Sequence, residues 1–315
     1  MAIRVTTSGA LNQTLSDINK NLKILQNIQK QLTTGNRINK PSDDPVGIIT
    51  TIKLKQGIQT TDQYQVNLKD GKSKLTMIEN SLSNVDDLLN EILGLSADIT
   101  SSTTSAQIPT VVKEINGLLE EVYLEANTKH LGRYIFGGQE TGNQPYIAQY
   151  SPSGTITSVT RNLIYDGTTI IRGIDDPTYQ TMAEGYDMQV NISGSRPFMP
   201  NGEGETNDVF DTLIRLRDSI NNNDMSTAKN IMRELSDEID NVIVQETVVG
   251  ERIQRLEVRE SNNNTLQTNN KSDLSDVLNA DYVQCITDLN YQNMILEASL
   301  KVGAQVIAPS LLDYI

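Results

Sequence analysis

The sequence predicts a mainly α fold: a long antiparallel helical rod or coiled coil built from both chain termini, with a small inserted β domain. Apolar residues recur every seven positions at both ends, and this spacing keeps one apolar seam on a helix. The middle of the chain is instead rich in glycine and tyrosine. The two seams comprise Leu11, Leu15, Ile18, Leu22, Leu25 and Leu32, and then Ala228, Leu235, Val242, Val249 and Leu256.

Composition supports thin seams rather than a large spherical core. Of the 315 residues 37% are hydrophobic and 4% aromatic, and tryptophan is absent. The net charge of −14 argues against nucleic acid as the main partner. Basic residues dominate the first 75 residues and acidic ones the rest, which indicates either two attracting arms or two ordinary solvated faces.

The N-terminal half predicts three helices. The first covers about residues 8–34 and ends at Gly35, and Asp44 caps the second, with Pro45 in its first turn. The third begins at Pro109 and ends near Arg133. Along the second helix, two sets spaced by seven define the seam: Leu54, Thr61, Leu68, Leu75, Leu82, Leu89 and Ser96, and Gly57, Tyr64, Gly71, Ile78, Val85, Ile92 and Ile99.

Short β-rich segments follow, at 146–150, 155–165, 168–174 and 186–193. Asp166-Gly167 is a strong two-residue hairpin signal between two of them. We expect the inserted β domain to cover residues 137–206.

Helical patterns resume near Asn207, and a long helix follows from Met225 to about Asn270. Its seam turns polar over residues 260–270, where we expect a hinge opposite the break at residues 35–45. We therefore assign residues 46–136 and 207–273 to a rod domain, and residues 1–45 and 274–315 to terminal assembly arms. Apolar positions in the last arm are Leu278, Tyr282, Cys285, Leu289, Leu296 and Leu300, preceded by Leu274.

No pattern for catalysis, a metal or a cofactor emerges. His130 is the only histidine and is expected near a helix end. The carboxylate pairs Asp43-Asp44 and Asp175-Asp176 each precede a proline, so capping explains them, and Glu251-Arg252 is interpreted as a solvated face. The single cysteine, Cys285, allows no internal disulfide. Neither a signal peptide nor a membrane-spanning run is visible, which fits a cytoplasmic protein or a signal-less export route.

Three segments resemble the bacterial flagellin superfamily, in the family's order. They are residues 34–47 (TGNRINKPSDDPVG), 64–68 (YQVNL) and 248–257 (VVGERIQRLE). Within the superfamily, residues 134–138, 207–213 and 280–301 resemble the members at the hook–filament junction. The motif positions are Gly35, Arg37, Ile38, Asn39, Asp43, Asp44, Pro45, Asn67, Gly250, Arg252, Arg255 and Leu256.

The resemblance implies a non-enzymatic axial protein of the extracellular flagellum, exported by the type III apparatus with the help of an export chaperone. Its implied partners are copies of itself in a ring, hook-associated protein 1 and flagellin. Terminal arms with exposed apolar seams are expected to order on assembly. The alternatives are a flagellin-type filament subunit and a coiled-coil adhesin or binding module that grips a ligand through its β domain.

Overall fold

The structure, a computed structural model, describes residues 7–101, 105–162, 164–166 and 169–307. The described residues form six α-helices and short two-stranded sheets, which confirms a mainly α fold with a small β insert. They divide into two compact units, residues 1–61 with 265–315, and residues 62–264. Each unit therefore combines segments from both halves of the chain. The three-part division into arms, rod and β domain stays a prediction.

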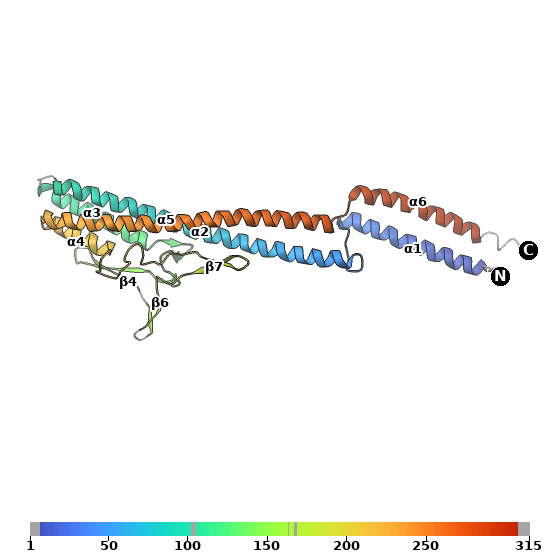
Figure 1. Cartoon of the computed structure of the whole chain (residues 1–315), viewed down its shortest axis with the longest axis horizontal. Helices are drawn as coiled ribbons and strands as arrows, with labels where there is room; N and C mark the ends of the chain where they lie inside the picture. The colour runs from blue at the N-terminus through green and yellow to red at the C-terminus, as the bar shows by residue number, and fades with distance from the viewer. Residues whose placement is uncertain (1–6, 102–104, 163, 167–168, 308–315) are drawn as a thin grey trace, which may run out of the picture. The chain divides into compact units, whose positions relative to one another are not determined.

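The first unit contains an antiparallel helix pair. Helix α1 (Thr7–Thr34) and helix α6 (Tyr282–Ile307) lie side by side (Figure 1). Their direction follows from two contacts: Asn21 reaches Ser299 near the far end of α6, whereas Gln31 reaches Cys285 near its start. The same unit holds the first turns of α2 and the last turns of α5.

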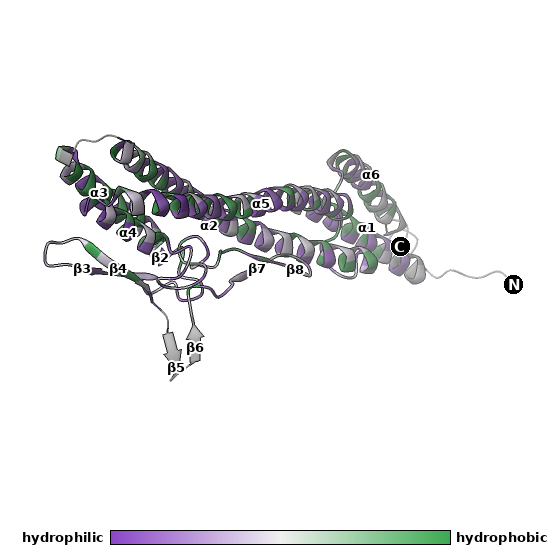
Figure 2. Cartoon of the chain, turned by 60° about the vertical axis from the view of Figure 1, so that its left-hand side comes forward, coloured by the Kyte–Doolittle hydropathy of each residue, from purple (hydrophilic) through white to green (hydrophobic). Residues whose placement is uncertain are grey.

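The second unit is a helical bundle. It holds most of α2 (Pro45–Ser101) and α5 (Met225–Leu278), together with α3 (Ile108–Ala126) and α4 (Val209–Asn221), and a 3₁₀ turn, η1 (Ser105–Gln107), precedes α3. Along α2 and α5, apolar and polar residues alternate at helical spacing (Figure 2). The seam side chains predicted for this unit are almost fully buried: Leu68, Leu75, Ile78, Leu82, Val85, Leu89, Ile92 and Ile99, with Ala228, Leu235, Val242, Val249 and Leu256.

The insert between α3 and α4 consists of antiparallel hairpins. The paired strands are β1 (Lys129–His130) with β2 (Arg133–Tyr134), β3 (Tyr146–Tyr150) with β4 (Ile156–Arg161), β5 (Ile164–Asp166) with β6 (Thr169–Arg172), and β7 (Tyr179–Ala183) with β8 (Tyr186–Gln189). The strand at 146–150 is confirmed, and the sequence analysis missed β7. The predicted Asp166-Gly167 turn includes Gly167, which lies outside the described residues.

The prediction that the third helix ends near Arg133 is wrong. Helix α3 ends at Ala126, and the chain turns at once into the β1–β2 hairpin. Asn127 explains the stop, because its backbone and side-chain N–H groups donate to the last carbonyls of the helix. His130 accordingly lies on a strand rather than near a helix end.

The β insert has no core of its own. Phe136, Tyr146, Phe198 and Phe210 form one ring cluster with centroid separations of 5.2–5.8 Å. Phe210 belongs to α4, so helices and insert share this cluster. Aromatic packing thus fixes the insert onto the bundle.

The expected break in the helix at residues 260–270 is wrong, because α5 continues as one helix to Leu278. The boundary between the two compact units nevertheless falls at residues 264–265, inside this segment, and a hinge there stays a prediction. Polar seam residues there bond across to α2: Asn263 donates to Gln65 Oε1 at 2.9 Å, and Gln65 donates to Glu260 at 3.0 Å. Because Asn263 and Glu260 are hydrogen-bonded to Gln65 on α2, the helix can continue through this polar segment. The chain breaks instead at residues 279–281.

Candidate functional site

The motif segment at residues 35–47 builds the turn between α1 and α2. Gly35 follows the last turn of α1 with φ +71°, and its N–H donates to the Gln31 carbonyl at 2.8 Å. A left-handed residue after a helix is the usual position of glycine. A Cβ here would lie 2.9 Å from the hydroxyl of Tyr282, an exposed side chain that can move aside, so it is the backbone conformation that requires glycine.

Two aspartates order the rest of the turn. The Asp43 carboxylate accepts the backbone N–H groups of Asn39 and Lys40 at 3.1 and 3.0 Å. The Asp44 carboxylate accepts the Gly47 N–H at 2.8 Å and so caps α2, as the sequence predicted. The Gly47 N–H, and then the Arg37 guanidinium at 3.1 Å, hold the pKa of Asp44 below its usual value, against some opposing desolvation.

The turn is fastened to the second break of the chain. The Arg37 N–H donates to the Leu278 carbonyl at 2.7 Å, and the Ala280 N–H donates to the Gly35 carbonyl at 2.9 Å. The Arg37 side chain adds a bond of 2.9 Å to the Val277 carbonyl. These bonds satisfy carbonyls at the end of α5 that have no partner in the helix itself. The break opposite residues 35–45 is therefore 279–281.

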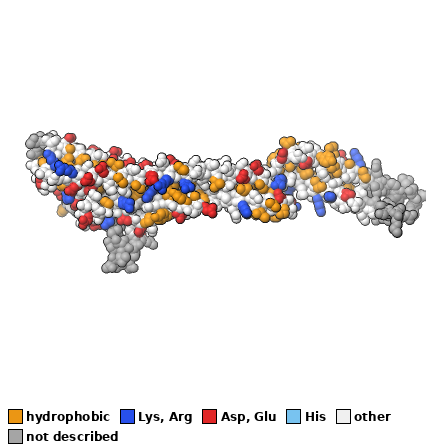
Figure 3. Space-filling model, in the orientation of Figure 1, with side chains coloured by type: hydrophobic (Ala, Val, Ile, Leu, Met, Phe, Trp, Pro, Cys, Tyr) orange, Lys and Arg blue, Asp and Glu red, His pale blue; other side chains and the backbone are white. Residues whose placement is uncertain are grey.

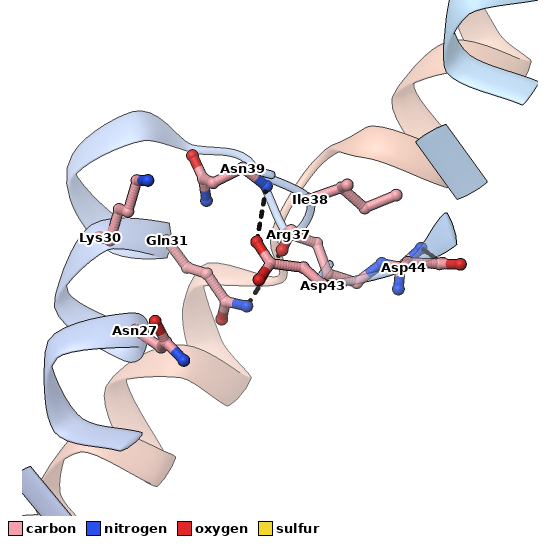
Figure 4. Close-up of a pocket in the computed structure, with 8 residues that line it drawn as sticks. All are labelled: Asn27, Lys30, Gln31, Arg37, Ile38, Asn39, Asp43 and Asp44. Carbon is pink, nitrogen blue, oxygen red and sulfur yellow. Dashed lines mark hydrogen bonds and ion pairs between the residues drawn. The ribbon is translucent and has the colours of Figure 1, made fainter. Parts of the chain in front are cut away.

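A polar pocket of about 290 Å³ lies beside this turn (Figure 4). Its walls come from the end of α1, including Asn27 and Lys30, and from the motif residues Arg37, Asn39 and Asp43. Ile38, which is 3% exposed, is the one apolar side chain among the described residues of its lining. The motif thus joins the two chain reversals through hydrogen bonds.

The predicted terminal seam residues meet along α1 and α6 to different degrees. Leu25 and Cys285 are buried. Half-buried positions are Ile18, Leu32, Leu278, Leu289 and Leu296. Leu15, Leu22, Tyr282 and Leu300 are exposed, and the side chain of Leu11 lies outside the described residues. Their role in assembly stays a prediction.

Apolar side chains also face outward on this helix pair. Besides the exposed seam positions they include Ile24, Val283, Ile286, Tyr291, Met294 and Val302. Figure 3 shows hydrophobic side chains gathered on the visible face of α1 and α6. Inside the pair, Gln292 is 7% exposed and donates to Asn21. The pair thus buries Gln292 alongside Leu25 and Cys285 and leaves several apolar side chains exposed, unlike a finished core.

The other two motif segments hold the β insert on the bundle. Asn67 on α2 donates to the Thr181 carbonyl of β7 at 2.7 Å. Arg252 on α5 donates to the Asn191 carbonyl at 2.6 Å and contacts Gln189 at 3.3 Å. Burial lowers the pKa of Arg252 from its usual value. The interpretation of Glu251-Arg252 as a solvated face is therefore wrong for Arg252.

Three neighbouring motif positions have simpler roles. Leu256 is 1% exposed and lies in the helical core. Arg255 pairs with Glu251 one turn away on the surface of α5. Gly250 lies where a Cβ would come 3.5 Å from Glu79, an ordinary contact. Gly71, a predicted seam position on α2, has no side chain and so makes room for Met182 and Val190 of the insert.

His130 and the pair Asp175-Asp176 form hydrogen bonds within the fold. His130 lies 3.3 Å from the Ser73 hydroxyl. Asp176 accepts the Gly173 N–H, and Asp175 accepts the Ser195 N–H, both at 3.0 Å. Among the described residues no group of three or more His, Cys, Asp or Glu side chains is placed to hold a metal ion. No described helix has the length and apolar content to cross a membrane.

Comparisons with known proteins agree with this architecture. Residues 5–141 match the family model of the bacterial flagellin N-terminal helical region. Flagellar hook-associated protein 3 of Salmonella typhimurium is 23% identical over 98% of each chain. Flagellin of Escherichia coli K12 is 28% identical, over 39% of this chain and 25% of its own.

Two solved structures share the fold. A putative flagellar hook-associated protein from Vibrio parahaemolyticus has a TM-score of 0.63 at 18% identity, covering 75% of this chain and all of that one. The flagellar junction protein FlgL from Legionella pneumophila has a TM-score of 0.56 at 15% identity, covering 73% and 99%.

The resemblance to the bacterial flagellin superfamily is confirmed by the family model, the relatives and the order of the three motif segments. Flagellin is matched over only part of the chain. The resemblance that runs from end to end is to flagellar hook-associated protein 3, the hook–filament junction protein.

Proposed function

We propose that this chain is a structural component of the bacterial flagellum that joins hook to filament through coiled-coil packing of its terminal helices. The end-to-end match to hook-associated protein 3 carries the proposal, because it covers 98% of this chain and 98% of that protein. The relatives are structural flagellar proteins, and we propose that this chain likewise has no enzymatic activity.

The partners that we propose are hook-associated protein 1 on the hook side, flagellin on the filament side, and copies of the chain itself in a ring. Export through the type III apparatus with an export chaperone would bring it to the extracellular flagellum. The apolar side chains that α1 and α6 leave exposed suit packing against neighbours, since covering them removes apolar surface from water.

A flagellin-type filament subunit is the less favoured function. The flagellin matches reported for this chain cover from 39% to 52% of it, whereas a filament subunit would be expected to match over both terminal regions and the rod. An adhesin or ligand-binding role for the insert is also less favoured, because Phe136, Tyr146 and Phe198 are buried in the shared core, which leaves Tyr150 and Tyr179 as its exposed rings among the side chains described.

Immunogold labelling of sheared flagella tests the proposal. We expect label at the hook boundary and none along the filament, whereas label along the whole length would favour a filament subunit. A chain lacking residues 1–40 and 280–315 supplies a second test. It should stay folded and monomeric, while the full chain gains protection of its terminal amides from hydrogen exchange on assembly. Full protection of these amides in the dilute monomer would contradict the assembly role.

A further inference from the structure

The β1–β2 hairpin presents an unusual tip. Leu131 is 85% exposed, more than any other large hydrophobic side chain recorded for the described residues. It has φ +49° and Gly132 has φ +79°, so both central residues are left-handed, as in a type I′ turn. Asparagine, aspartate or glycine normally occupies the first of these positions, because a bulky side chain there is strained by about 1 kcal/mol. Leu131 at this tip therefore lowers the stability of the hairpin relative to glycine or asparagine.

Basic residues flank this tip. Lys129 and Arg133 are both exposed, and the Lys129 ammonium lies 4.4 Å from the centre of the Tyr134 ring. Hydrogen bonds from Tyr134 N–H to the Thr141 carbonyl and from Ile135 N–H to Thr128 carbonyl anchor the hairpin base. The result is a rigid apolar knob between two positive charges.

A groove of complementary character runs between α2 and α3. It has a volume of about 390 Å³, and Leu88 and Leu124 form its apolar part. Leu124 is 60% exposed. Carboxylates rim the groove: Asp87, Glu91, Glu121 and Glu125. Among the ion pairs of the described residues, none includes Asp87, Glu91 or Glu121, so this negative charge has no cation of its own.

The hairpin cannot fill the groove of its own chain. His130 lies 3.3 Å from Ser73, whereas the groove begins at Asn84, eleven residues further along α2. At the rise of an α-helix this separation is about 16 Å. The knob and the groove are thus both rigid, both exposed and set apart on one bundle.

We infer that the β1–β2 hairpin of one copy docks into the α2–α3 groove of a second copy, with Leu131 against Leu88 and Leu124. Lys129 and Arg133 then face the rim carboxylates, and this pairing of opposite charge specifies the register. Different patches meet, so the contact is heterologous and repeats from copy to copy as a ring or a helical array. Within one copy, Ser73 beside the hairpin and Leu88 in the groove lie about 22 Å apart along α2.

This inference rests on the proposed assembly of copies of the chain, and it specifies which two surfaces of the bundle meet. Cross-linking tests it with the full chain carrying Cys285→Ser, so that each preparation has one chosen thiol. Leu131→Cys is mixed with Leu124→Cys and treated with a short bismaleimide. We expect a linked pair several-fold above the control mixture of Leu131→Cys with Val258→Cys, a site of similar exposure on α5.

Charge reversal supplies the specificity test. Arg133→Glu in the Leu131→Cys chain should reduce the linked product several-fold, and Glu121→Lys in the Leu124→Cys chain should restore at least half of it. A yield equal to that of the Val258→Cys mixture, or one insensitive to Arg133→Glu, overturns the contact.

Sedimentation velocity on the same mixtures separates this outcome from a failure of the proposed function. Copies that associate without the cross-link refute only the hairpin contact, whereas copies that never associate and never cross-link refute this contact and self-assembly together.

Discussion

Glu238 carries the sharpest prediction, because a carboxyl group lies buried between α4 and α5. It is 1% exposed, Thr212 donates to its Oε1 at 2.7 Å, and its Oε2 has no hydrogen-bond partner among the described residues. Burial raises its pKa from 4.5 to about 8, and nearby Asp208 and Glu234 act in the same direction, against the Thr212 hydrogen bond. The folded chain therefore keeps this proton at neutral pH, whereas the unfolded chain loses it.

The consequence is a pH dependence of stability. Below pH 4.5 both states hold the proton, so the group has no effect. Between pH 4.5 and 8 only the folded state keeps it, and the free energy of unfolding falls by about 1.4 kcal/mol per pH unit. Raising the pH from 5 to 8 should therefore cost about 4 kcal/mol through Glu238 alone. Glu238→Gln cannot titrate, and its amide oxygen keeps the Thr212 bond.

Urea unfolding followed by circular dichroism at pH 5, 6, 7 and 8 measures the effect. We expect the free energy of unfolding of the variant, relative to that of the parent chain, to rise steadily with pH. The difference should change by about 4 kcal/mol from pH 5 to pH 8. Glu121→Gln, which removes an exposed carboxylate on α3, is the control and should leave the pH slope unchanged. Equal slopes for Glu238→Gln and the parent would refute the assignment of a buried neutral carboxyl.

Three further substitutions test other parts of the fold. Gly35→Ala introduces a side chain at φ +71° and against the Tyr282 hydroxyl, so we expect about 1–2 kcal/mol of destabilisation, seen as faster amide exchange around the turn and none in the bundle core. Arg252→Ala leaves the Asn191 carbonyl without its donor, and β7–β8 should become cleavable by a protease at concentrations that spare the parent chain, whereas an unchanged digest would refute the tether. Leu82→Ala, at 0% exposure, should lower the free energy of unfolding by about 2–5 kcal/mol in denaturant melts, and a loss below 1 kcal/mol would contradict its burial.

The helical core could be predicted from the sequence because periodicity reports burial directly. Each heptad position from Leu68 to Ile92 lies inside the bundle, as its spacing required. The Asp44 cap and the Gly35 stop were equally predictable, since each has a local chemical signature. In these cases the information lies within one or two helical turns.

The failures share a different cause: they depend on residues far apart in the chain. Residues 260–270 carry polar seam residues, yet the helix continues because Gln65, on another helix, pairs with Glu260 and Asn263. Arg252 has the spacing of a surface residue, and only its contact with Asn191 shows otherwise. The sequence near Asn263 does not show that its amide pairs with another helix, and the sequence near Arg252 does not show that its side chain bonds to the insert.

The same contrast separates the two regions of helix pairing. The bundle buries leucine, isoleucine and valine at or near 0% exposure, whereas the α1–α6 pair buries Gln292 and Cys285 and leaves Leu15 and Leu300 half open to solvent. Two amphipathic helices bury less apolar surface than a bundle, and ordering their side chains costs entropy. The terminal pair is therefore the part of the chain whose stability depends most on what covers it. The motif at residues 35–47 is bonded to residues 277–280 and so holds the two chain reversals beside each other.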